Sequence, residues 1–505
     1  MKRSAKLATG VVFLLAAAFQ ASNAKAQDAA APCPRDVRPE AQGMPSEDRI
    51  FSWIEDLTKI GKRLTGTPGG EKAAAYVKCQ FEALGLQDVR YEKATSWLWQ
   101  ADKSSFSVNG RPIDSFPVNY SFITPDQPSV FSTGPGGLQA PIVDVGDGNA
   151  WAIRARDVKG KIVVFDLKFE VSTVAFLPFV DFLWDPKLTL LEPSIFAANP
   201  YLTNLSRVVK RLQEAGAAGF VGVLSDYYDS NRYHNEYYRR SQMTIPGVWV
   251  TKSDGQLLRE QLRKAGKSAQ ANLVLEGSRT EVEARAVVGV LPGRSHETIL
   301  MTSHHDSVSA GAVEDASGVG ALLAQLQIAA SKPAAEREKT MLFATMDSHF
   351  TGYQVHQAFA DKYITRQATP YKLVAGITLE HIARQGVIKN GQLEMRDQPE
   401  LMGIMNNFSY GVRRQLKRSI IKNDLRRSAT LKAGLLCKTF GLPTDASFTC
   451  VAGLPTASLI AAPIYLYDED DTLDKVAKDQ LIPVTKVFAD LVDVLDRTPA
   501  DQIGQ

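Results

Sequence analysis

The chain has 505 residues, a formal net charge of +3 at pH 7, and 22% charged residues. This length exceeds what one hydrophobic core serves, so two or three domains are expected. The near-neutral charge gives no argument for a nucleic-acid partner, and none is predicted.

The N-terminus has the pattern of an export signal. Lys and Arg residues precede the apolar run 11–18, and Ala24-Lys25-Ala26 matches a cleavage site. The alternative is a membrane anchor, but the run is too short to span a bilayer. No other segment is long and apolar enough to span, so no stable membrane insertion is expected. We interpret residues 1–26 as a signal peptide that directs the protein to the periplasm or the medium.

The even number of cysteines allows two disulfides in an oxidising compartment. Sequence proximity alone suggests the pairs Cys33–Cys79 and Cys437–Cys450. No CxxC motif is present, so these residues do not resemble zinc ligands.

Residues 27–133 form the first part of the mature chain. An apolar stripe predicts a helix over 47–60, and a glycine-rich loop follows at 61–70. A second helix ends at Gly85, and the alternating stretch that contains Trp97 predicts strands.

Residues 134–277 are expected to form a small inserted α/β module. Its strands and helices follow one another in the order 157–165, 205–215, 216–224, 245–250 and 253–265, with Ser253 as the cap of the last helix. The segment 169–201 between them is rich in Phe, Pro and Leu. We interpret it as an excursion packed on a neighbouring domain, with a substrate-facing wall as the alternative.

Residues 278–505 alternate between strands and helices. The predicted strands are Ala284–Val290, Thr298–Thr302, Thr340–Thr345, Leu373–Leu379 and Thr456–Ile460, with helices at 319–330 and 352–363. This alternation predicts an α/β fold with a mostly parallel mixed sheet covered by helices on both faces. The basic run 413–432 is typical of a solvated face, and a gate for acidic substrates is the alternative.

The densest polar stretch follows the predicted strand at 298–302. His304, His305 and Asp306 come at the strand end, and Glu314 and Asp315 come just before the next helix. A polar connecting loop would explain them, but strand ends are where α/β sheets usually build sites.

The same pattern recurs at two further strand ends. His349 follows the strand at 340–345, and Glu380 and His381 follow the strand at 373–379. Because parallel strands bring their carboxyl ends together, these side chains could converge. Imidazole and carboxylate groups are zinc ligands, and bound zinc activates water. The chain has no HExxH, GxSxG or P-loop motif.

The sequence resembles the secreted zinc aminopeptidases, a family that includes glutamate carboxypeptidase II and the glutaminyl cyclases. Gly61-Lys-Arg-Leu-Thr-Gly-Thr-Pro-Gly is similar to the family's N-terminal signature, and the stretch 304–318 is similar to its His-x-Asp-Ser and Asp-Asp-Asn-Ala-Ser-Gly motifs. The module at 134–277 resembles a protease-associated (PA) domain. The resemblance covers nearly all of the mature chain and implies a zinc-exopeptidase-like fold.

The resemblance implies one metal position that keeps its ligands. It places a zinc ligand at His304, oriented by Asp306, and a bridging carboxylate at Glu314, for which Asp315 could substitute. The strand-end ligand falls on Glu380.

The resemblance also implies that the second metal position is lost. Its two own ligands fall on Phe350 and Tyr467, and Phe cannot bind a metal. One zinc ion is therefore more plausible than two, and none is an alternative.

The family's general base falls on His349, which can take a proton from water. His349 could instead be a replacement ligand, with His305 or His381 as further candidates, and Tyr467 could donate to a developing oxyanion.

We therefore expect an exported zinc exopeptidase or amidase that acts on peptide or aminoacyl substrates. An inactive homologue that binds through its cleft and PA-like module is the first alternative. Cyclase-type acyl transfer is the second, although the cyclase zinc ligands correspond to Phe350 and Tyr467. The oligomeric state is not indicated.

Overall fold

The computed structural model describes residues 43–124, 129–191, 199–235, 242–439 and 441–504. The predicted signal peptide and Cys33 lie outside the described residues. No helix among the described residues combines the length and the apolar character needed to cross a bilayer.

Four parallel strands form the centre of the main sheet. In spatial order they are β12 (Lys339–Met346), β11 (Ser295–His304), β13 (Lys372–Leu379) and β18 (Thr456–Ala461). Almost every residue of these strands is buried, which explains why they are continuous apolar runs rather than alternating ones. All four were predicted from the sequence, and the α/β fold with a mostly parallel sheet is confirmed.

Antiparallel partners complete the sheet on both sides. They are β10 (Gln270–Leu291), which pairs with β12, and β16 (Met402–Asn406), which pairs with β18 and with parallel β17 (Ser428–Lys432). The predicted strand at 284–290 is thus the end of a much longer strand. β10 also runs through the predicted domain boundary after residue 277. A separate hairpin consists of β14 (Arg384–Lys389) and β15 (Gln392–Pro399).

Helices cover both faces of the main sheet. One face carries α1 (Glu47–Ile60), α2 (Pro68–Ala83), α6 (Gly318–Ala330) and α11 (Lys478–Arg497), which pack on the inward side chains Ile299 and Phe343. The opposite face carries α7 (Gln354–Ala360), whose Val355 and Phe359 pack on Leu300 and Leu342. The alternation of adjacent residues 299 and 300 between the two cores is the strand period of two.

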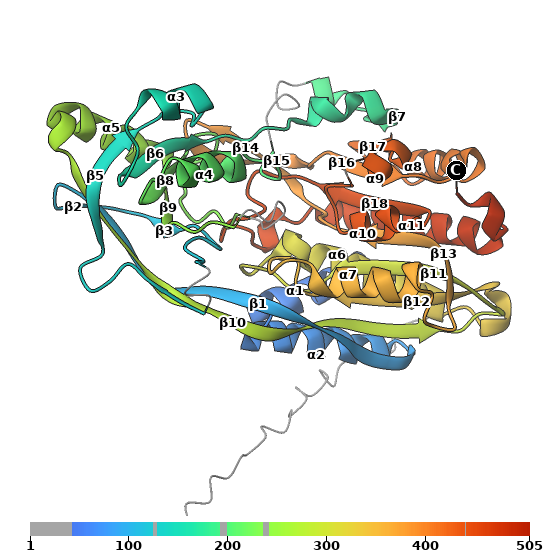
Figure 1. The fold of residues 1–505 in the computed structure, drawn as a ribbon. Helices are drawn as coiled ribbons and strands as arrows, with labels where there is room; N and C mark the ends of the chain where they lie inside the picture. Colours follow the sequence, from blue (N-terminus) through green and yellow to red (C-terminus); the bar gives the residue numbers. More distant parts are fainter. Residues whose placement is uncertain (1–42, 125–128, 192–198, 236–241, 440, 505) are drawn as a thin grey trace, which may run out of the picture.

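A second, smaller unit lies at the end of the molecule away from α11 (Figure 1). Its parallel strands are β5 (Leu138–Asp144), β6 (Ile162–Leu167), β8 (Gly219–Leu224) and β9 (Gly247–Val250), with β3 (Phe116–Pro117) antiparallel to β9. Its helices are α3 (Ala150–Ala155), α4 (Leu205–Glu214) and α5 (Lys252–Ala265). Thr251, not Ser253 as predicted, caps α5, because its hydroxyl accepts from the backbone N–H of Asp254.

A long ribbon connects the two units. β1 (Gln87–Val108) pairs with β10 along nearly its whole length, and the short β2 (Arg111–Ile113) and β4 (Val130–Ser132) pair beside it. One end of β10 pairs with β5 and the other with β12, so the sheets of both units form one continuous surface.

The excursion at 169–201 packs on the main sheet. Its strand β7 (Val180–Trp184) pairs antiparallel with β17. Tyr201, at the end of the excursion, reaches the strand-end cluster described below. The described part of this segment thus packs on the main sheet, as expected, and the substrate-facing wall stays a prediction.

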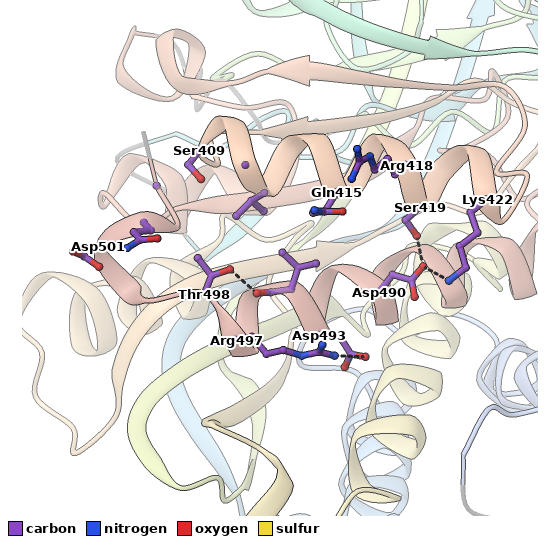
Figure 2. A pocket seen from close by; sticks show the side chains of 15 residues that line it. Ser409, Gln415, Arg418, Ser419, Lys422, Asp490, Asp493, Arg497, Thr498 and Asp501 are labelled. Carbon is purple, nitrogen blue, oxygen red and sulfur yellow. Dashed lines mark hydrogen bonds and ion pairs between the residues drawn. The ribbon is translucent and has the colours of Figure 1, made fainter.

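The basic run at 413–432 belongs to α8 (Tyr410–Lys422) and β17. Lys417 pairs with Asp181 at 2.9 Å, and Lys422 pairs with Asp490 of α11 at 3.2 Å. Figure 2 shows the open cavity between α8 and α11, about 1110 Å³ in volume, with Lys422 beside Asp490. None of the predicted site residues lines this cavity.

The last short helices, α9 (Gly434–Thr439) and α10 (Ala446–Val451), are joined by the Cys437–Cys450 disulfide, which confirms one predicted pair. Cys79 is also disulfide-bonded, and its predicted partner is the Cys33 that is not described.

Candidate metal centre

The predicted site residues meet at one edge of the main sheet. β11 ends at His304, the loop after β12 carries His349, and His381 follows β13 by two residues. Glu314 lies in the turn that leads into α6. Because the three strands are parallel, their carboxyl ends lie together and bring these side chains into contact.

Glu314 is the centre of the cluster. Its Oε1 lies 3.3 Å from His304 Nε2 and 3.6 Å from His349 Nε2, and its Oε2 lies 2.5 Å from His381 Nε2. Both carboxylate oxygens, His304 Nε2 and His381 Nε2 are buried and have no hydrogen bond of good geometry among the described residues. Buried polar atoms are nearly always satisfied, so these four atoms point to a missing cation.

Each of the three imidazoles is anchored through its other nitrogen. His304 Nδ1 lies 3.2 Å from Asp306 Oδ1, and His349 Nδ1 lies 3.0 Å from Asp445 Oδ1. His381 Nδ1 lies 2.9 Å from a backbone carbonyl of β18. Such anchors are typical of metal-binding histidines, since they fix the tautomer and aim Nε2 at the ion.

Two overlapping triplets could hold an ion, namely His304, Glu314 and His349, or His304, Asp315 and His381. The rings of His304 and His349 are stacked, with centroids 4.1 Å apart and planes 19° apart. A ring nitrogen binds through a lone pair in the ring plane, so an ion in one stacked plane lies well outside the other. The rings of His304 and His381 are nearly perpendicular, at 89°, and the Nε2 atoms of both lie against Glu314. Ring orientation therefore favours His304 and His381 as joint ligands.

Asp315 has hydrogen bonds that Glu314 lacks. It accepts from Ser303 Oγ at 2.6 Å, from the backbone N–H of His381 at 3.1 Å and from that of Gly318 at 3.2 Å. Burial raises the pKa of Asp315 to about 6. Its carboxylate is thus largely satisfied by the protein, which leaves Glu314 as the carboxylate in need of a cation.

Glu380 belongs to neither triplet, although its Oε2 is buried and has no hydrogen-bond partner among the described residues. Its Oε1 accepts from the backbone N–H of Asp445 at 3.0 Å. Burial, and after it the nearby Asp445 carboxylate, raises the pKa of Glu380 to about 8. The predicted ligand role of Glu380 stays a prediction, and the adjacent His381 occupies the position beside Glu314.

The charges of the cluster compensate one another. Burial would lower the pKa of His381, but the Glu314 carboxylate raises it to about 9. Burial would likewise raise the pKa of Glu314, but His381 and His304 hold it below its usual range. A carboxylate that stays ionised in a buried site is suited to bind a cation.

A buried clamp holds the turn that carries Glu314. The Arg63 guanidinium donates to the backbone carbonyls of His305 at 3.1 Å and Gly311 at 2.9 Å, and to that of Ala310. On the other side, Asp471 Oδ2 accepts from the backbone N–H of Glu314 at 2.8 Å. Arg63 comes from the loop before α2, which explains why the glycine-rich segment lies next to the site.

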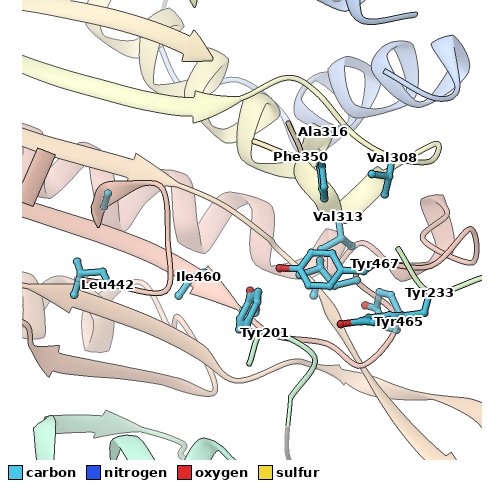
Figure 3. Packing of buried hydrophobic residues seen from close by; sticks show 14 of the residues in the cluster. Tyr201, Tyr233, Val308, Val313, Ala316, Phe350, Leu442, Ile460, Tyr465 and Tyr467 are labelled. Atoms are coloured by element: carbon cyan, nitrogen blue, oxygen red, sulfur yellow. The ribbon is translucent and has the colours of Figure 1, made fainter. Parts of the chain in front are cut away.

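Phe350 and Tyr467 lie next to each other among the buried aromatic side chains (Figure 3). Their ring centroids are 6.3 Å apart, and Tyr201 lies 5.9 Å from Tyr467. The Tyr467 hydroxyl is buried and has no hydrogen-bond partner among the described residues. The Tyr201 hydroxyl lies 3.0 Å from His381 Nδ1. The expected oxyanion role of Tyr467 stays a prediction.

Sequence reasoning missed two residues of this region. Asp445 contacts His349 and, through its second oxygen, His356 Nε2 at 2.7 Å. His356 stands seven residues after His349 on a predicted helix, and this spacing was a usable signal. Nothing in the sequence marks Asp445, because it is distant along the chain.

The donor set fits a transition metal. Two imidazole nitrogens and one carboxylate with unsatisfied oxygens match a common catalytic zinc set, and hard cations such as Mg²⁺ prefer oxygen ligands.

Comparisons with known proteins agree with this picture. Residues 286–492 match the model of Peptidase family M28. The zinc aminopeptidase BSAP of Bacillus subtilis superposes with a TM-score of 0.64 at 18% identity, covering 92% of this chain and 99% of that one.

Two further solved structures have the same fold. A Peptidase M28 precursor from Shewanella amazonensis SB2B gives a TM-score of 0.65 at 18% identity, covering 89% of this chain and 93% of its own. The aminopeptidase from Aneurinibacillus sp. strain AM-1 gives 0.60 at 16% identity, with 88% and 93% covered. No curated protein matches the chain significantly. With this fold and with the family model matched over residues 286–492, the chain carries a Peptidase family M28 domain.

Proposed function

We propose that the protein is a metal-dependent exopeptidase or amidase that hydrolyses peptide-like substrates with one metal ion. The observation that carries the proposal is the buried Glu314 carboxylate, which has no hydrogen bond of good geometry among the described residues and which the Nε2 atoms of His304 and His381 face. These three residues would hold the ion. When bound, zinc supplies Lewis acidity for attack on an amide carbonyl.

The limit to one ion follows from His304. Both candidate triplets use it, and its Nδ1 is already engaged by Asp306, so a single lone pair on Nε2 is left for metal. Phe350 and Tyr467 offer no replacement carboxylate or imidazole for a second ion. Together these contacts support a reduced site.

His349 is the proposed general base. Its ring is stacked on His304 but not directed at the same ion, and its Nε2 faces Glu314 at 3.6 Å. A neutral imidazole there can take a proton from water and return it to the leaving amine. Asp306 would orient His304, and Tyr467 would donate to the oxyanion.

The remaining expectations belong to the same proposal. Residues 134–277 would be an inserted PA-like domain, and their parallel β5–β6–β8–β9 sheet is consistent with this. Residues 1–26 would direct export to the periplasm or beyond. Peptides or aminoacyl compounds would be the substrates.

Metal content and hydrolysis test the proposal together. The purified mature protein is expected to bind about one zinc per chain, and a panel of aminoacyl p-nitroanilides and dipeptides should reveal zinc-dependent cleavage that a chelator abolishes. Zinc well below one per chain, unchanged by His304→Ala, would contradict it.

Burial of the cluster favours a second candidate, a non-catalytic binding protein. His304 and Glu314 are 0% exposed and His381 is 2% exposed, so the described residues close the site to solvent. A protein that binds zinc and a peptide but cleaves no member of the panel would match this candidate.

A further inference from the structure

A buried carboxylate lies between two imidazoles beside the candidate metal centre. Asp445 Oδ1 lies 3.0 Å from His349 Nδ1, and Asp445 Oδ2 lies 2.7 Å from His356 Nε2. Both histidines belong to the chain segment that leads into and through α7, while Asp445 immediately precedes α10. The three side chains are almost completely buried.

The backbone of Asp445 is also held in place. The backbone N–H of Asp445 donates to Glu380 Oε1 at 3.0 Å, and the side chain is not used to cap α10. Both oxygens of Asp445 are therefore committed to imidazoles. An ionised carboxylate accepts only, so it requires N–H on the nitrogen of each ring that faces it.

This requirement fixes the tautomer of His349. With the proton on Nδ1, the neutral ring presents a lone pair on Nε2, which faces Glu314 Oε1 at 3.6 Å and the Tyr353 hydroxyl at 3.3 Å. The opposite tautomer would turn a lone pair towards the Asp445 carboxylate at 3.0 Å, a closer contact between two acceptors than the 3.6 Å between Nε2 and Glu314 Oε1.

We propose that Asp445 is a positioning residue that holds His349 in the tautomer and orientation of a general base, with His356 fixing the second carboxylate oxygen. The base role rests on the proposed hydrolytic function, whereas the tautomer does not. During hydrolysis, His349 Nε2 takes a proton from water as the new C–O bond forms. It then passes this proton to the leaving amine nitrogen as the C–N bond breaks, and Asp445 stays ionised throughout.

Asp445→Asn tests the assignment, because the amide keeps the shape and can donate to His349 Nδ1. Zinc content should stay at the wild-type level and KM within about twofold, while kcat falls by roughly 10²-fold or more, the usual share of general acid–base catalysis. Asp347→Asn is the matched control. Asp347 is a buried acid on the same loop as His349, and its carboxylate accepts from the backbone N–H of Arg285. It should leave kcat unchanged.

Nitrogen-15 NMR of histidine-labelled protein gives a readout independent of turnover, with His349→Gln identifying the signals. The wild type should show His349 protonated on Nδ1, and Asp445→Asn should shift the proton to Nε2.

Unchanged kcat and tautomer in Asp445→Asn, or an equal loss of kcat in Asp347→Asn, would overturn the assignment. If the wild type cleaves nothing yet shows this tautomer change, the hydrolytic function fails and the positioning role stands. Should Asp445→Asn not fold, Asp445→Glu displaces the oxygens, and an unaltered kcat and tautomer there would equally refute it.

Discussion

Glu314 Oε2 lies 2.5 Å from His381 Nε2, a closer contact than either of the other two imidazoles makes with this carboxylate. The ring planes of His381 and His304 lie at 89°, and His304 Nε2 also faces Glu314, at 3.3 Å, so both nitrogens are proposed to bind one ion beside this carboxylate. We expect His381→Ala to weaken zinc binding by at least about 100-fold, since even an outer-shell partner is worth roughly 10–100-fold. Isothermal titration with zinc measures the affinity.

His305→Ala is the matched control for this prediction. His305 is equally buried and adjacent to His304, but its Nδ1 contacts Thr345 Oγ1 at 3.0 Å and it belongs to neither triplet. Its removal should leave zinc affinity within a few-fold of wild type. Equal losses in both variants would indicate a general disruption of the strand end and would remove His381 from the ligand set.

Phe350 and Tyr467 stand where the resemblance places the ligands of a second ion. Their rings are 6.3 Å apart, which places both near one volume of space. The double variant Phe350→Glu, Tyr467→His is expected to bind two zinc ions per chain instead of one, because it restores a carboxylate and an imidazole there. Metal analysis after dialysis measures the stoichiometry.

Each single variant serves as a control for the double variant. Phe350→Glu alone supplies one new ligand and should keep about one zinc per chain, with reduced thermal stability because it buries a charge without a partner. A double variant that folds and still binds one ion would show that the second position cannot be rebuilt by these two residues alone.

The sheet and its helices could be predicted because their signals are local. Apolar runs of strand length at 298–302, 340–345 and 373–379 coincide with strands, and their parallel order follows from the helices between them. The length of β10 could not be predicted, because its first half is half-exposed and is stabilised by pairing with β1. Such pairing is a tertiary contact that a sequence window does not contain.

The candidate site was predictable where its residues directly follow the ends of neighbouring parallel strands. His304, Glu314 and His349 lie in contact as the strand order implies. The sequence could not show whether Glu380 or His381 lies beside Glu314. Neighbouring residues at a strand end point in opposite directions, and the angle at which the loop leaves the strand determines which of them faces the site. The contact of Asp445 with His349 and His356 could not be predicted for a different reason, because these residues are close only in the folded chain.

Arg63 is completely buried and donates to several backbone carbonyls around the Glu314 turn, including Gly311 at 2.9 Å. Arg63→Lys keeps the charge but loses the planar fork, so several of these carbonyls lose their donor. We expect a destabilisation of about 3 kcal/mol, typical of lost hydrogen bonds to a buried charged group. Urea unfolding of the zinc-loaded protein measures it. Arg294→Lys, at an exposed ion pair with Glu338, should change stability by less than about 0.5 kcal/mol.

His234 makes the fold sensitive to acid. Burial, with smaller contributions from Lys62 and Arg232, lowers its pKa to about 3 from the ordinary 6.5. Between these values the unfolded chain takes up a proton that the folded chain does not, so stability falls as the pH drops from about 6.5 towards 3. The loss attributable to His234 is on the order of 5 kcal/mol at the acid end. His234→Asn should therefore lose less stability than wild type between pH 7 and pH 4, although His305, with a similarly low pKa of about 3, retains its own contribution. Melting temperatures measured across this range test the prediction, and parallel pH profiles for the two proteins would contradict it.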